Sequence, residues 1–72
     1  MANDEKAKLR SLLGYWLEHN QAHRQEFQEW ATKARAMGEA TASEAMLTAA
    51  REMEPVNRAL SRALKSLVKE EN

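Results

Sequence analysis

The stretch KARAMGEATASE, residues 33–44, decides the fold of this chain. A helical pattern precedes it and ends at Gly38, because glycine adopts at little cost the left-handed conformation that closes many helices. From Thr41 to Glu44, the sequence TASE is typical of a capping box, which satisfies backbone N–H groups at the start of a helix. Two helices joined by so short a turn pack as antiparallel neighbours. The stretch therefore predicts an all-α chain folded as a two-helix antiparallel hairpin.

Apolar residues recur at steps of three and four on both sides of this turn, which is the period of an amphipathic helix. We expect the first helix over residues 4–37 after an Asn or Asp cap, the turn at 38–41, and the second helix over 42–69. Pro55 lacks a backbone N–H and should bend the second helix near residues 51–55, on its solvent side. The apolar positions of the first helix are Leu9, Leu12, Leu13, Trp16, Phe27, Trp30, Ala31, Ala34 and Met37. Those of the second helix are Ala42, Met46, Ala49, Met53, Val56, Leu60, Ala63, Leu64 and Leu67.

The composition predicts one small helical domain over residues 1–72, since good helix formers dominate and β-branched residues are few. Eleven basic and eleven acidic residues give a net charge of zero, whereas nucleic-acid binders are normally basic. The N-terminal segment lacks the apolar region of a secretory signal, and no apolar run is long enough to cross a bilayer. We therefore expect neither nucleic acid nor membrane as a partner, and a cytoplasmic location that the absence of cysteine also fits.

A chain of this length buries only a small core, and such chains usually gain stability from disulfides, a metal or a partner subunit. The absence of cysteine excludes disulfides and leaves the other two routes. Two helices also leave each apolar stripe half covered. We therefore expect a homodimer in which two hairpins form a four-helix bundle, with a higher bundle as the alternative.

Polar residues interrupt the apolar stripe of both helices near their middle. The segment HNQAH, residues 19–23, holds both histidines of the chain, and Asn57 lies within the stripe of the second helix. With a turn centred near residue 40, His23 should face Asn57. Burying unpaired amides and imidazoles is costly, so these residues are expected to meet in one hydrogen-bonded polar layer that fixes register and oligomeric state. The layer consists of His19, Asn20, His23 and Asn57.

The same histidines also suggest a metal site. His19 and His23, four residues apart, project from one helix face, and Glu26 follows on that face. The pattern H-x3-H-x2-E thus offers three candidate ligands for a divalent ion, and imidazole with carboxylate suits Zn, Ni or Fe. One chain supplies at most these three, and a dimer would bring two sets together. The pattern leaves a metal site and a hydrogen-bonded layer as open alternatives.

Catalytic patterns are absent. The histidine spacing matches that of the zinc-protease motif H-E-x-x-H, but Asn20 stands in place of the glutamate that acts as a base. The Glu-x-x-His motif of di-iron bundles is missing as well, because Trp16 and Asn20 lie three residues before the histidines. The sequence contains no glycine-rich phosphate loop and no cysteine nucleophile. We therefore expect a protein that is not an enzyme.

Basic side chains of the second helix fall within about 60° of one another at 100° per residue. This basic stripe consists of Arg51, Arg58, Arg62, Lys65 and Lys69. It suits an anionic partner, or it is a solvated face that pairs with the acidic flank of the first helix, Glu18, Glu26 and Glu29. The first interpretation would make the chain an adaptor for an acidic protein.

The segment YWLEHNQAHRQEFQEWATKA, residues 15–34, resembles a signature of small uncharacterised prokaryotic helical-hairpin proteins. These share the pattern W-[LI]-E-H-N-x2-H-x2-E-F-x2-W, followed by a second helix with a central asparagine. The matching positions are Trp16, Glu18, His19, Asn20, His23, Glu26, Phe27 and Trp30, with Asn57 downstream. The resemblance implies a helical hairpin and no particular activity. Our expectation is a non-enzymatic, homo-oligomeric structural or interaction module; the alternatives are a divalent-metal binder and an adaptor.

Overall fold

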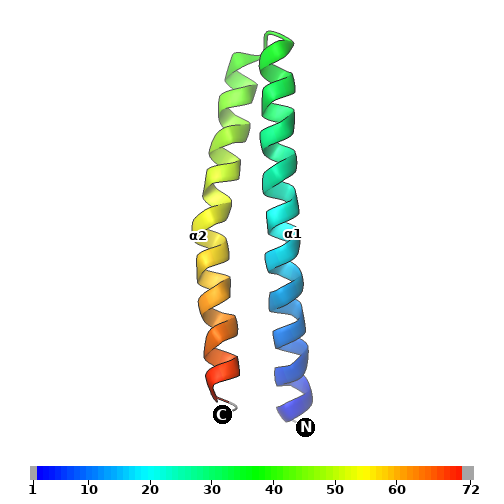
Figure 1. Cartoon of the computed structure of the whole chain (residues 1–72), viewed down its shortest axis with the longest axis vertical. Coiled ribbons are helices and arrows are strands. Elements are labelled where there is room, and N and C mark those ends of the chain that lie inside the picture. Colours follow the sequence, from blue (N-terminus) through cyan, green and yellow to red (C-terminus); the bar gives the residue numbers. More distant parts are fainter. Residues whose placement is uncertain (1, 71–72) are drawn as a thin grey trace.

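The computed structural model describes residues 2–70, with side chains described for residues 4–68. It consists of two long helices, α1 (Ala2–Ala36) and α2 (Ala40–Glu70), which lie side by side along most of their length (Figure 1). The first turn of α1 and the last turn of α2 lie at the same end of the hairpin, opposite the turn (Figure 1). The described part of the chain contains no strand, and the molecule measures 54 × 16 × 13 Å. The predicted all-α antiparallel hairpin is confirmed.

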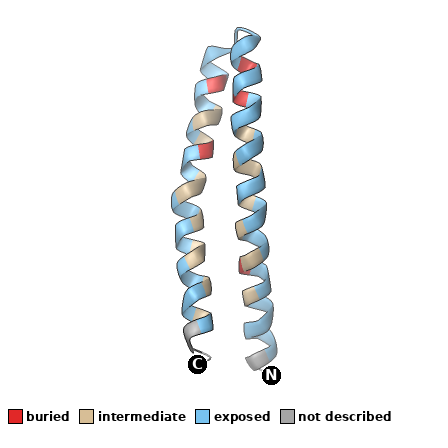
Figure 2. Ribbon diagram, viewed as in Figure 1, coloured by how far each residue is buried: buried red, intermediate tan, exposed pale blue. Residues whose placement is uncertain are grey.

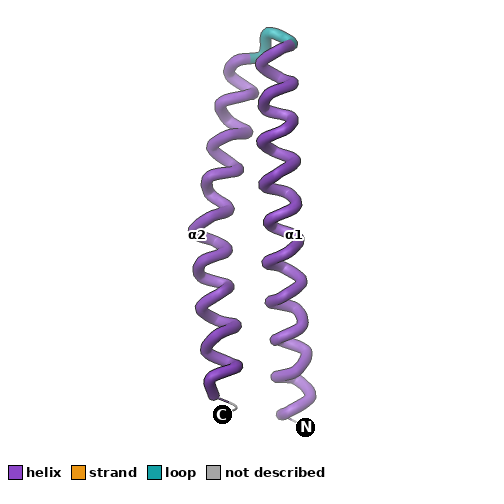
Figure 3. Tube along the Cα trace, viewed as in Figure 1, coloured by secondary structure: helices purple, strands orange, loops and turns teal. Residues whose placement is uncertain are grey.

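The turn between the helices is a Schellman motif centred on Gly38 (Figure 3). Gly38 has φ of 86°, and its N–H donates to the carbonyl of Arg35 at 3.0 Å. The N–H of Glu39 donates to the carbonyl of Ala34 at 2.9 Å, so two carbonyls at the end of α1 are satisfied. Glycine is required at position 38 because a side chain there would strain the left-handed backbone.

Both helices begin earlier than the sequence indicates. The capping box at Thr41 is not formed, because α2 already begins at Ala40 and Thr41 lies within its first turn. The Ser43 N–H donates to the carbonyl of Glu39 at 2.9 Å, so the helix restarts as soon as the Schellman turn ends. The turn is therefore shorter than the expected 38–41, and α1 similarly begins at Ala2 rather than at residue 4.

Pro55 lies inside α2 and faces solvent, as its position on the helical wheel predicts. The helix continues through it without interruption and bows gently along its length (Figure 1). Residues 51–55 therefore do not break the helix.

The core between the helices is small and gathers mainly near the turn (Figure 2). Small side chains make most of it, which lets the two backbones approach closely in that half of the hairpin. The buried residues are Leu13, Ala31, Ala34, Ser43 and Ala50. In the rest of the hairpin, the facing side chains other than Leu13 are only half-buried. One chain therefore covers little of its apolar surface, as the sequence predicts.

A second apolar surface runs along one broad side of the hairpin. At 100° per residue it lies about 30–90° from the mean inward direction of α1 and about 70–150° from that of α2, and the antiparallel arrangement turns both strips to the same side. We call this surface the outer apolar face; it consists of Leu9, Leu12, Trp16, Phe27 and Trp30 of α1 and Met53, Val56, Leu60, Ala63 and Leu67 of α2. Its side chains range from half-buried to more than half exposed, with Trp30 at 51%. Across the described residues, neither helix has the length and hydropathy needed to cross a membrane.

Candidate functional site

An asparagine pair joins the two helices at mid-length. The side-chain amide of Asn20 donates from Nδ2 to Oδ1 of Asn57 at 3.0 Å, and both residues are half-buried. The helical periodicity places each asparagine on the side of its helix that faces the other. An amide–amide hydrogen bond of this kind favours one alignment of two helices, since sliding by one turn would leave both amides without their partner.

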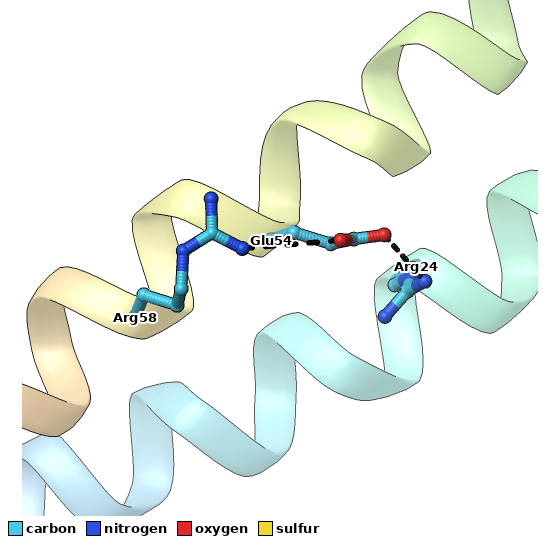
Figure 4. A network of polar contacts seen from close by, with 3 residues as sticks. All are labelled: Arg24, Glu54 and Arg58. Carbon is cyan, nitrogen blue, oxygen red and sulfur yellow. Dashed lines mark hydrogen bonds and ion pairs between the residues drawn. The ribbon is translucent and has the colours of Figure 1, made fainter.

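An ion pair lies one turn closer to the hairpin turn. Arg24 of α1 donates from Nη2 to Oε1 of Glu54 on α2 at 2.7 Å, and Arg58 approaches Oε2 of the same carboxylate at 3.9 Å (Figure 4). The Arg24 and Glu54 side chains are 31% and 42% exposed, so water weakens their attraction without removing it. Both residues occupy inward positions that the sequence analysis left unassigned, although each lies one turn from an asparagine on the same face.

The predicted pairing of His23 with Asn57 is wrong by one helical turn, because Asn20 occupies that position. The turn is centred at Gly38 rather than near residue 40, and each residue of displacement in a turn moves the facing partner by two. The expected polar layer is consequently divided within one chain. Asn20 and Asn57 lie between the helices, whereas His19 and His23 lie toward the outer apolar face.

The two histidines belong to a column of four rings along α1. Tyr15 stacks on His19 with ring centroids 5.4 Å apart, and His23 stacks on Phe27 at 5.8 Å. Between them, the two imidazoles meet edge to face at 4.4 Å, with their Nε2 atoms 2.9 Å apart. Because four residues bring a helix round by slightly more than one turn, the i, i+4 spacing places each ring above the last. The column fixes the orientation of both imidazoles.

Glu26 contacts this column from the opposite edge of one imidazole. Its Oε1 lies 3.4 Å from Nδ1 of His23, while the Nε2 atom of that ring points to His19. The three predicted ligands are therefore neighbours, but Glu26 does not face the side where the two Nε2 atoms meet. Among the described residues, no three His, Asp or Glu side chains come together in a way that could hold a metal ion.

The basic stripe lies on the side of the hairpin opposite to the outer apolar face. Its contacts are local: Arg58 approaches Glu54, and Arg51 donates to the hydroxyl of Thr48 at 3.1 Å. Within the described part of the chain, no ion pair joins the stripe to Glu18, Glu26 or Glu29. The side chain of Lys69 lies outside the described residues.

A shallow groove between the helices accompanies the polar contacts. It has a volume of about 410 Å³ and is lined by Leu17, Gln21, Arg24, Glu54, Asn57, Arg58 and Ser61. Both arginines in its wall contact the same carboxylate, which compensates only one of their two positive charges, and the Arg58 side chain is 65% exposed to solvent. The groove therefore keeps one excess positive charge, but it is shallow and open to solvent, and no ligand is assigned to it.

These features define a two-helix antiparallel hairpin with polar contacts between its helices and a histidine pair beside an exposed apolar face. The chain belongs to the family described as Domain of unknown function (DUF8180), whose model matches residues 9–67. That range covers the asparagine pair, the ion pair and the ring column. The chain has no match among the curated proteins and none among the solved structures.

Proposed function

We propose that this protein is a non-enzymatic self-association module of the cytoplasm, in which two hairpins pair through their outer apolar faces into a four-helix bundle. The observation that carries the proposal is the exposure of large apolar side chains on that face: Leu9 is 41% exposed, Leu12 45%, Trp16 39%, Trp30 51% and Val56 47%. Single exposed apolar residues are ordinary on protein surfaces, but a continuous strip of them is typical of an interface.

A second copy of the chain suits this surface in size. The broad side of the hairpin extends 54 Å by 16 Å, which is large enough for a standard interface, in which each partner buries ~800 Å². The apolar strip runs along most of this side, so a partner of equal length covers it best. Another hairpin has that length by definition.

The charge of the chain also favours a second copy. Eleven basic and eleven acidic residues give zero net charge, so two copies approach without long-range repulsion. A strongly acidic or basic partner would gain little from such a surface. The basic stripe, on the opposite side, remains outside the interface, and the observed contacts give no reason to prefer an adaptor that uses it.

The proposal is tested by sedimentation equilibrium of the natural chain and of a Leu12→Lys/Val56→Lys variant. We expect a dimer of the 8.2 kDa chain that the variant converts to a single chain, because two lysines would have to be buried in the interface. A Gln25→Lys/Ser66→Lys variant places the same charges on exposed positions outside the face and should remain dimeric. Circular dichroism should show whether each variant keeps its helices.

A natural chain that remains single at concentrations of tens of micromolar would contradict the proposal, since a standard interface gives affinities of this order or better. Dissociation of the control variant would also contradict it, because the interface would then lie elsewhere. A hairpin that binds a different protein and does not self-associate would also contradict the proposal. The outer apolar face would then be the binding site for that protein.

A further inference from the structure

His19 and His23 have no role in the self-association proposal, yet they lie beside its interface. Leu12 and Trp16 precede them on the outer apolar face and Trp30 follows. His19 is exposed, and the side chain of His23 is 40% exposed in the single chain. Covering this face with a second copy would remove water from imidazole nitrogens, which costs free energy unless they find other partners.

The geometry of the pair suits a metal ion. The two Nε2 atoms lie 2.9 Å apart; with Zn–N bonds of ~2.0–2.1 Å, such a pair subtends about 90° at the metal. A further separation of ~0.4 Å gives the tetrahedral angle that zinc prefers, and both rings must also turn so that their Nε2 lone pairs converge on the metal instead of pointing along the hydrogen bond. The stacked rings of Tyr15 and Phe27 hold both imidazoles near this arrangement.

Glu26 is positioned to orient His23 and not to bind the metal itself. Its Oε1 lies 3.4 Å from Nδ1 of His23, which favours a proton on Nδ1 and leaves the lone pair on Nε2. Metal-binding histidines commonly donate their other N–H to a carboxylate, and Glu26 is close enough to accept such a bond after a small side-chain adjustment. Without a metal, the same pair is satisfied by a hydrogen bond in which Nε2–H of His19 donates to Nε2 of His23.

Two imidazoles are too few for a structural zinc site, which usually has four protein ligands. The position of the pair offers a remedy, because His19 is at the middle of α1, which spans Ala2–Ala36. In an antiparallel dimer with its two-fold axis perpendicular to the helices, residues at mid-length meet their own counterparts. Stacking of α1 on α1 would then bring two histidine pairs together.

We propose that His19 and His23 form half of a four-imidazole site for a divalent transition metal such as Zn²⁺, which an antiparallel second copy completes. This inference rests on the proposed self-association. In this site, Glu26 orients the imidazole of His23, and the metal ion links the two hairpins. Imidazole ligands suit Zn²⁺, Ni²⁺ and Cu²⁺, and zinc is the natural first probe.

The test is a Zn²⁺ titration followed by calorimetry and native mass spectrometry. We expect one Zn²⁺ per two chains, and loss of binding in both His19→Ala and His23→Ala. Glu26→Gln should keep the stoichiometry and weaken affinity by about tenfold or somewhat more, as expected for a supporting carboxylate. Glu29→Gln, an exposed carboxylate change on the same helix, should bind like the natural chain.

Absence of binding, or one Zn²⁺ per chain, would overturn the shared site, and complete loss of binding in Glu26→Gln would overturn its supporting place. Sedimentation in a chelator separates this proposal from the previous one. A dimer in the chelator that takes up no zinc would overturn the metal site and leave self-association intact. A single chain in the chelator that dimerises with half an equivalent of Zn²⁺ would support the metal site and contradict metal-free association.

Discussion

At the scale of residues, the asparagine pair is the contact that specifies how the two helices align. Asn20 and Asn57 bond across the hairpin at 3.0 Å, in a region where the other facing side chains are half-buried. A hydrogen bond of this kind contributes only about 1 kcal/mol net, but leaving one amide without its partner costs a similar amount or more. The pair therefore contributes more to alignment than to stability.

We expect Asn57→Leu alone to lower the free energy of unfolding by about 1 kcal/mol, because the amide of Asn20 loses its partner in a half-buried place. The double variant Asn20→Leu/Asn57→Leu should recover most of this loss, since two apolar groups then face each other. Urea denaturation measures both. A double variant less stable than the single one would show that the pair acts through some other contact.

The candidate residues could be named from the sequence, but their partners could not. Periodicity placed Asn20 and Asn57 on inward stripes, and their bond confirms that part. It did not separate the inward side from the outer apolar face, because both carry apolar residues and merge into one broad stripe on a helical wheel. His19 and His23 were therefore grouped with the asparagines, although they turn toward the outer face.

At the scale of elements, the turn determines the register of the whole hairpin. The sequence predicts the stop at Gly38 correctly, because only the left-handed conformation of glycine closes α1 so tightly. The sequence does not predict the first residue of α2, since the TASE motif suggests a cap at Thr41 whereas α2 begins at Ala40. The hydrogen bonds of the Schellman turn override the local preference of the capping box, and the register shifts with them.

Replacing each of the two glycines with alanine should change the stability of the protein in opposite directions. Gly14 lies inside α1 and an added Cβ would meet nothing within 4 Å, so Gly14→Ala should stabilise the protein by about 0.5–1 kcal/mol. Gly38→Ala should destabilise it by about 1 kcal/mol, because φ of 86° strains any residue with a side chain.

Thermal unfolding of both glycine variants checks this prediction. A Gly38→Ala variant as stable as the natural chain would mean that the turn takes another conformation. A destabilised Gly14→Ala variant would mean that the open space beside Gly14 is filled in the assembled protein, and so would extend the interface toward that side of α1.

At the scale of the whole molecule, the hairpin has a surface that a single chain leaves uncovered. Over residues 4–68, its buried core consists of Leu13, three alanines and one serine, while the tryptophans and several leucines stay half exposed. A chain that folded alone would place its largest apolar side chains in the core. The distribution is the one expected if the hairpin is half of the four-helix bundle that we propose. Composition and periodicity predict this incomplete burial but not the exact contacts.

The measurement that tests self-association most directly is the fluorescence of the two tryptophans, followed together with mass over a dilution series. Trp16 and Trp30 both belong to the outer apolar face and are 39% and 51% exposed in one chain. If two hairpins pair through this face, the emission maximum lies toward the blue in the dimer and shifts to the red on dilution, in step with the loss of dimer mass. A dimer whose emission stays red at every concentration, or a chain that remains single throughout, would contradict the account.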